Sequence, residues 1–319
     1  MKNPAYKLLM IAALVGVTFQ SCKKEDKDEQ EQLNSEFKQF NDDSNDYKNE
    51  SDQVNDDVNN SVGASSLGRL AGVQSSPLCG VTIDSSQIAQ KILFYNFDGV
   101  TSCFSPSRTR SGTIKVQLTT GNNWSDQGSV LTLTYINFKV TRQSDNKWIK
   151  FNGVSTLNNI NGHDWIGFAL GTSSITYESR AFNVQVEYNN GQTAVWNHAR
   201  QSAISFEANG APNGTNIFYF NCNGDTSLSG YSAVDSWGTN RFGQPFTTYY
   251  NNDWDSDSYC GFWRPTSGQL THVVNNSTFV LTLGVDPSGT PITNPDLCAY
   301  GFKVGWTVNG NTQVAVFSY

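Results

Sequence analysis

Two kinds of hydrophobic spacing divide this chain. Near the N-terminus, apolar residues recur every three or four positions, from Leu33 and Phe37 to Val54 and Val58. This spacing places them on one side of a helix, so it predicts an amphipathic helix over about residues 33–60. The apolar stripe of that helix either packs on the rest of the protein or stays partly open.

After residue 77 the spacing changes to strict alternation. Phe182, Val184 and Val186 alternate with polar residues up to Asn190-Gly191, a pair that predicts a two-residue type I′ hairpin turn. Further strands are expected at Lys91–Phe97, Thr113–Leu118, Val130–Val140, Ile217–Phe220, Leu270–Val274, Phe279–Leu283 and Phe302–Val308. Many short strands with frequent turns predict an all-β fold of antiparallel β-sandwich-like layers, preceded by the one helix.

A weak internal repeat bears on domain organisation. Lys91–Val116 and Thr278–Val304 both run in the order strand, turn, Cys, loop, strand. The repeat favours two related halves, residues 77–210 and 211–319. One continuous domain over both ranges is the open alternative.

The first 22 residues carry an export signal. Lys2 and Lys7 precede an apolar run from Leu8 to Phe19, which is too short to span a bilayer of about 30 Å as a helix. Ser21-Cys22 follows and resembles the cleavage site of bacterial lipoproteins, in which the cysteine is acylated. Residues 1–21 are therefore expected to be a signal peptide and Cys22 the lipidation site. Acyl chains hold a protein at the membrane.

Charge is concentrated just after this site. Residues 23–62 contain 13 Asp and Glu but 5 Lys, whereas the whole chain has a formal net charge of -7. The segment 22–76 is therefore interpreted as an acidic stalk that contains the helix, and the body that follows is nearly neutral. A nucleic-acid partner is not expected, because no basic stripe is present.

Five cysteines remain for the body. An exported protein favours disulfides. The repeat suggests the pairs Cys79–Cys103 and Cys260–Cys298 and leaves Cys222 free. Because connectivity cannot be deduced from spacing, Cys222 could replace any partner. Metal-ligand spacing is absent, so no zinc site and no cofactor are expected.

Several short motifs are spread along the body and accompany the lipoprotein signal. They are Cys79-Gly80-Val81-Thr82-Ile83-Asp84, Asp98-Gly99, Arg108-Thr109-Arg110-Ser111-Gly112-Thr113-Ile114, Gly238-Thr239-Asn240-Arg241-Phe242-Gly243, Pro265-Thr266-Ser267-Gly268 and Asn309-Gly310. With Cys22 and the acidic residues after it, they resemble Bacteroidetes-type outer-surface lipoproteins of unknown function. The resemblance implies a position on the outer face of the outer membrane. It implies no activity.

Catalytic patterns find little support. Asp253-Trp254-Asp255-Ser256-Asp257 has the alternating carboxylates of a calcium loop, but Ser258 and Arg264 stand where an EF-hand needs Gly and Glu, so a solvated turn is the better interpretation. No nucleophile elbow is present for a serine hydrolase, and only three Glu occur in the body. Arg108 and Arg110 are interpreted as partners in ion pairs between strands.

Aromatic residues are the most suggestive chemical resource. Exposed rings stack on sugar faces, and neighbouring Asn and Asp side chains bind hydroxyl groups. The candidate ligand-binding residues, in one Asn- and Asp-rich stretch, are Trp237, Tyr249, Tyr250, Trp254 and Trp263. Aromatic residues also fill β-sheet cores, which is the competing interpretation. Trp254, between two Asp, is the best candidate for an exposed ring.

These observations predict a non-enzymatic, lipid-anchored cell-surface protein with a role in adhesion or envelope interaction. The alternative is a glycan-binding lipoprotein that serves polysaccharide uptake. The expected partners are the membrane, through the lipid, and in the alternative a glycan.

Overall fold

The structure is a computed structural model of the whole chain. It describes residues 35–36, 38–62, 78–104, 107–164, 167–168, 171–261, 264–275, 277–294, 296–308 and 311–319. The expected signal peptide, Cys22 and Trp263 lie outside these residues. The described part of the chain contains no helix that is long and apolar enough to cross a membrane.

Strands dominate the described residues, and one helix precedes them. The helix covers residues 38–62, close to the predicted range. The strands are β1 (Val81–Asp84), β2 (Ile92–Asp98), β3 (Arg108–Thr120), β4 (Ser129–Arg142), β5 (Trp148–Asn159), β6 (Ser174–Tyr188), β7 (Thr193–Glu207), β8 (Ile217–Gly224), β9 (Thr226–Leu228), β10 (Tyr231–Thr239), β11 (Pro245–Asp257), β12 (Ser267–Val274), β13 (Ser277–Val285), β14 (Gly301–Val308) and β15 (Asn311–Ser318). The predicted all-β class with a single N-terminal helix is confirmed.

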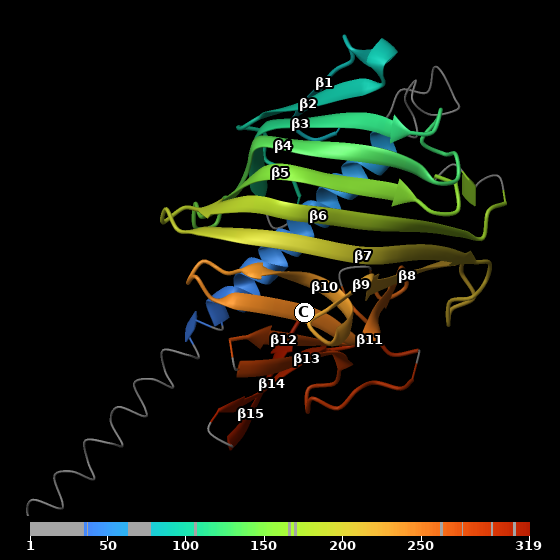
Figure 1. Cartoon of the computed structure of the whole chain (residues 1–319). Helices are drawn as coiled ribbons and strands as arrows, with labels where there is room; N and C mark the ends of the chain where they lie inside the picture. The colour runs from blue at the N-terminus through green and yellow to red at the C-terminus, as the bar shows by residue number, and fades with distance from the viewer. Residues whose placement is uncertain are drawn as a thin grey trace, which may run out of the picture. The chain divides into compact units, whose positions relative to one another are not determined.

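All fifteen strands belong to one antiparallel sheet. Strands β1 to β7 pair in chain order, β7 continues to β10, and β10 to β15 again follow in order (Figure 1). The sandwich-like layering that the short alternating segments suggested therefore takes the form of a single sheet. Its longest strands, β6 and β7, have 15 residues each. A hairpin turn joins them, as is possible for neighbouring antiparallel strands.

Strand pairing is also continuous across the expected boundary near residue 210. On the side of β7 away from β6, β8 pairs with residues 200–207 and β10 with residues 195–198. Both strands pair with β11 on their other side. Together they occupy one strand position between β7 and β11, so the two expected halves share one sheet.

The hairpin between β6 and β7 has a different turn from the predicted one. Gly191 N–H donates to Tyr188 O at 2.8 Å, and Tyr188 N–H donates to Gln192 O at 3.0 Å. This is a three-residue loop in which only Gly191 needs a positive φ, of 80°. The Asn-Gly signal thus located the hairpin correctly but named the wrong turn type.

The chain forms two compact units that divide after Tyr47, and the larger unit runs from Lys48 to Tyr319. It therefore begins inside the segment expected to be a stalk. Within this unit, Val54, Val58 and Val62 of the helix are buried. The helical residues 48–62 cover one face of the sheet, which we call the helix-bound face, and we call the other the opposite face.

Polar groups of the helix also contact the helix-bound face. Ser61 Oγ lies 2.5 Å from Tyr95 Oη, and Trp124 Nε1 donates to Asn59 Oδ1 at 2.7 Å. Arg108 and Arg110 pair with Glu50 and Asp57 of the helix. The expectation of ion pairs between strands is therefore wrong for these arginines, because their side chains point to the helix rather than along the sheet.

Candidate functional site

Two disulfides fix the loops at either end of the sheet. Cys79 is bonded to Cys103 and Cys260 to Cys298, while Cys222 is free and buried. The pairing suggested by the internal repeat is confirmed.

A buried polar cluster lies between the helix and the sheet. Arg200 of β7 is almost fully buried and pairs with Asp52 at 2.7 Å and with Asp235 at 3.1 Å. Lys48 Nζ lies 3.0 Å from Asp52 and 3.6 Å from Cys222 Sγ. Burial acts to raise the pKa of Asp52, but the positive charges of Lys48 and Arg200 prevail and lower it. The cluster thus holds paired charges that attach the helix to the sheet.

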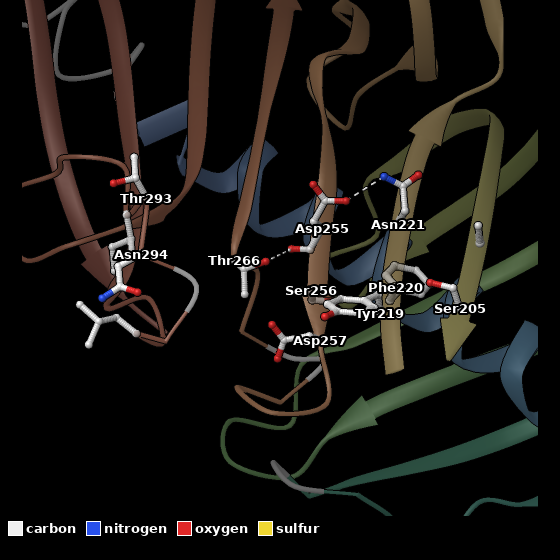
Figure 2. Close-up of a pocket in the computed structure, with 13 residues that line it drawn as sticks. Ser205, Tyr219, Phe220, Asn221, Asp255, Ser256, Asp257, Thr266, Thr293 and Asn294 are labelled. Carbon is white, nitrogen blue, oxygen red and sulfur yellow. Dashed lines mark hydrogen bonds between the residues drawn. The ribbon is translucent and has the colours of Figure 1, made fainter. Parts of the chain in front are cut away.

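A cavity of about 520 Å³ lies on the opposite face, where β7, β8 and β11 run side by side. Strand pairing places its side chains, because residues directly opposite each other share a face. Asn221 of β8 pairs with Ala203 of β7 and Asp255 of β11, and Tyr219 pairs with Ser205 and Asp257. Figure 2 shows Asn221, Asp255, Tyr219, Ser205 and Asp257 around the cavity, with Thr293 and Asn294 across from them.

The carboxylates of the cavity are held by hydrogen bonds. Asn221 Nδ2 donates to Asp255 Oδ1 at 2.8 Å and to Asp253 Oδ2 at 3.2 Å. Ser267 Oγ donates to Asp255 Oδ2 at 2.7 Å. Asp257 Oδ1 accepts the backbone N–H of Cys260 at 2.6 Å. A carboxylate has about four acceptor positions, so each Asp retains acceptor capacity for a ligand.

Apolar groups complete the wall. Tyr219 is 38% exposed and Leu297 is 57% exposed. Partial burial and the neighbouring Glu207 carboxylate, with which its hydroxyl is hydrogen-bonded, raise the pKa of Tyr219. Leu297 precedes Cys298, so the disulfide to Cys260 ties this wall to the chain just after Asp257. The cavity therefore combines fixed acceptors, an aromatic face and a cross-linked wall.

Its charge is one-sided. Among the described residues that line the cavity, Asp255 and Asp257 are the charged side chains, and Lys, Arg and His are absent. Within the described residues no group of three or more His, Cys, Asp or Glu is arranged to hold a metal ion. The arrangement suits neutral ligands that carry hydroxyl groups.

The structure separates the aromatic residues singled out in the sequence. Tyr250 is buried beside Cys222 on the helix-bound face, and Trp254 packs on the same cluster with Lys48 Nζ 4.9 Å from its ring centroid. Trp254 is therefore not the exposed ring that its neighbours suggested, because the alternation of β11 turns it away from Asp255. Trp237 and Tyr249 lie on the opposite face, each half-buried.

One further expectation is wrong, and two residues of the cavity were missed in the sequence. The segment Asp253–Asp257 is not a solvated turn but the end of strand β11. Tyr219 and Asn221 were not singled out: Tyr219 lies in the predicted strand Ile217–Phe220, but Asn221 lies just beyond it, and β8 continues to Gly224. Their importance comes from pairing with β11, 34 residues later for Asn221 and Asp255, which alternation alone cannot reveal.

Comparison with known proteins adds no relative: no family model, curated protein or solved structure matches this chain. The likeness to outer-surface lipoproteins rests on short motifs alone and stays a prediction.

Proposed function

We propose that this protein is a non-enzymatic, lipid-anchored cell-surface protein that binds glycans. The export signal and Cys22 support acylation, and the acidic residues that follow support a position on the outer face of the outer membrane. Binding a glycan of another surface serves adhesion, and binding a nutrient glycan serves uptake. Both roles depend on the same recognition step.

The cavity on the opposite face carries this proposal. Sugars present hydroxyl groups at their edges and C–H groups on their faces, so they need hydrogen-bond acceptors and an apolar surface together. Asp255 and Asp257 are acceptors already held by Asn221, Ser267 and the Cys260 N–H. Because these side chains are ordered without ligand, binding costs less conformational entropy. The Tyr219 ring supplies the apolar face.

Glycan-array screening followed by calorimetric titration tests the proposal. The full mature chain in detergent is used, because residues 48–62 belong to the folded unit. We expect Tyr219→Ala and Asp255→Ala to weaken binding at least about tenfold, since each removes a direct contact worth about 1.5 kcal/mol or more.

The matched control is Asp145→Ala. Asp145 is also an aspartate held by hydrogen bonds, but it lies in the turn between β4 and β5. Its loss should leave the affinity unchanged. Absence of binding across a broad panel of neutral and acidic glycans, or equal affinity for the Tyr219 and Asp255 variants and the native protein, refutes glycan binding at the cavity.

The anchor is tested separately with radiolabelled palmitate. Incorporation into the native protein and its loss in Cys22→Ala are expected. A Cys22→Ala protein that still takes up label, or native protein that takes up none, refutes acylation at this residue.

A further inference from the structure

Aromatic side chains continue from the cavity along the opposite face. Trp237 of β10 pairs with Asn197 and with Thr247 of β11, and Tyr249 follows two residues later on β11. Asn197 and Ser205 are separated by an even number of positions on β7, and side chains alternate between the two faces of a strand. No bulge interrupts the pairing of β7 with β8 or with β10. These residues therefore share the face that carries the cavity.

Each of the two rings is held by a second ring. Phe182, which is 57% exposed, meets Trp237 edge to face with centroids 5.9 Å apart. Tyr231 stacks on Tyr249 with centroids 4.7 Å apart and planes 18° from parallel. We call Phe182, Trp237, Tyr231 and Tyr249 the aromatic strip. Because aromatic pairs restrict each other's rotation, the strip offers apolar surface that a ligand need not order.

Polar side chains join the strip to the cavity. Asn251 and Asn252 are exposed on β11 between Tyr249 and Asp253. Asp253 accepts a hydrogen bond from Asn221, which also binds Asp255 of the cavity. From Thr247 to Asp255 the strand rises by at most about 26 Å at 3.3 Å per residue. A chain of several sugar units is needed to reach from one end to the other.

The charged residues of the cavity and of the neighbouring strands favour uncharged glycans over anionic ones. Arg180 lies on the same face, where it pairs with Ala199 of β7, but Glu178 and Asp225 already neutralise its guanidinium. The cavity itself carries the Asp255 and Asp257 carboxylates. A polyanionic glycan with uronic acid or sulfate groups would meet repulsion from these carboxylates, and no Lys, Arg or His is among the described residues that line the cavity.

Resting on the proposed function, we infer that the ligand is a linear, uncharged oligosaccharide chain, with one end in the cavity and the remainder along β11 on the aromatic strip. The strip then supplies affinity only for chains long enough to reach it. Short ligands depend on the cavity alone.

Titration against a length series tests this inference. The probes are neutral gluco-, manno- and xylo-oligosaccharides of two to eight units, with oligogalacturonates of equal length as charged counterparts. For the native full chain we expect affinity to rise with length for a neutral series, by about tenfold or more, and weak binding of the charged series.

Variants separate the strip from the cavity. Trp237→Ala and Tyr249→Ala should remove the gain with length and leave the affinity for the shortest bound ligand unchanged. Trp148→Ala is the matched control, because Trp148 is a half-buried tryptophan of β5 near Lys139 and Lys150, away from β11. It should keep the gain with length.

The outcomes distinguish the two proposals. Binding that depends on Tyr219 but does not rise with length, or a gain with length that survives Trp237→Ala and Tyr249→Ala, overturns the inference and leaves the proposed function standing. Tighter binding of the charged series overturns the assignment of ligand class. No binding by any series and none on the array overturns the proposed function, and the inference with it.

Discussion

His272 on β12 is the clearest example of a single residue whose environment sets its chemistry. Its side chain is buried, and Thr248 Oγ1 lies 2.8 Å from Nδ1. Burial lowers the pKa of His272 to about 4, against the smaller opposing effect of the Asp235 carboxylate. His198 on β7 is buried as well, and its pKa is lowered in the same direction.

We expect the free energy of unfolding to fall in mild acid because of His272. An unfolded His has a pKa of about 6.5, so between pH 6.5 and 4 the unfolded chain binds a proton that the folded chain does not. The contribution of His272 to the free energy of unfolding is fully present above pH 6.5. It decreases by up to about 3 kcal/mol as the pH falls to 4. Urea unfolding at a series of pH values should show a smaller decrease for His272→Gln than for the native protein.

His163→Gln is the control for this measurement, because the His163 side chain is exposed. It should reproduce the native pH dependence. If the His272 variant does so too, its side chain is not held neutral in the folded protein.

Elements differ in how far the sequence alone could predict them. The helix and strands such as β2, β4 and β13 followed from spacing, because burial on one face imposes a period of 3.6 or 2 on apolar residues, whereas β5, β10 and β11 were not predicted. The pairs Arg110–Asp57 and Arg200–Asp52 could not be predicted, since their partners lie 53 and 148 residues apart. The acidic composition of residues 22–76 was interpreted as that of a stalk, although Asp52 and Asp57 of the helix pair with the buried Arg200 and Arg110.

The candidate site shows the same limit. Asp255 and Trp254 are neighbours in the sequence, yet they lie on opposite faces of β11, and bulges in this strand make a simple count of alternation unreliable. The cavity needs β7, β8, β11 and the loop at Thr293–Leu297 together. The sequence anticipated the disulfide that holds this loop and the first half of β8, but not their meeting with β11.

The two disulfides allow the loop at the cavity to be tested as an element. Replacing Cys260 and Cys298 by Ser opens a 38-residue loop and should cost about 4 kcal/mol of stability. It should also weaken ligand binding at conditions where the protein stays folded, because Leu297 and Asn294 lose their fixed position. Replacing Cys79 and Cys103 opens a 24-residue loop and should cost about 3 kcal/mol without changing affinity.

Thermal unfolding and titration of both double variants separate stability from binding. Equal affinities for the two variants and the native protein would mean that the cross-link does not shape the cavity. A loss of affinity in both would point to a general loosening instead.

At the scale of the whole molecule, the helix and the sheet form one folding unit. Residues 48–62 cover apolar and charged groups of the helix-bound face, including Tyr95, Trp124 and Arg200. Without the helix, Arg200 keeps Asp235 but loses Asp52, and Arg110 loses Asp57. Leaving one partner of a buried pair alone costs about 3–5 kcal/mol.

We therefore expect a chain that begins at residue 63 to be insoluble or to unfold without cooperativity, whereas a chain that begins at residue 48 folds. Burial of Val54, Val58 and Val62 adds about 1.5 kcal/mol or more for each side chain. Together with the ion pairs, this contribution is comparable to the 5–15 kcal/mol that stabilises a typical domain. Circular dichroism and urea unfolding of the two truncated chains provide the comparison. Cooperative unfolding of the shorter chain at a similar urea concentration would show that the helix is not needed for folding and that the sheet is stable with that face uncovered.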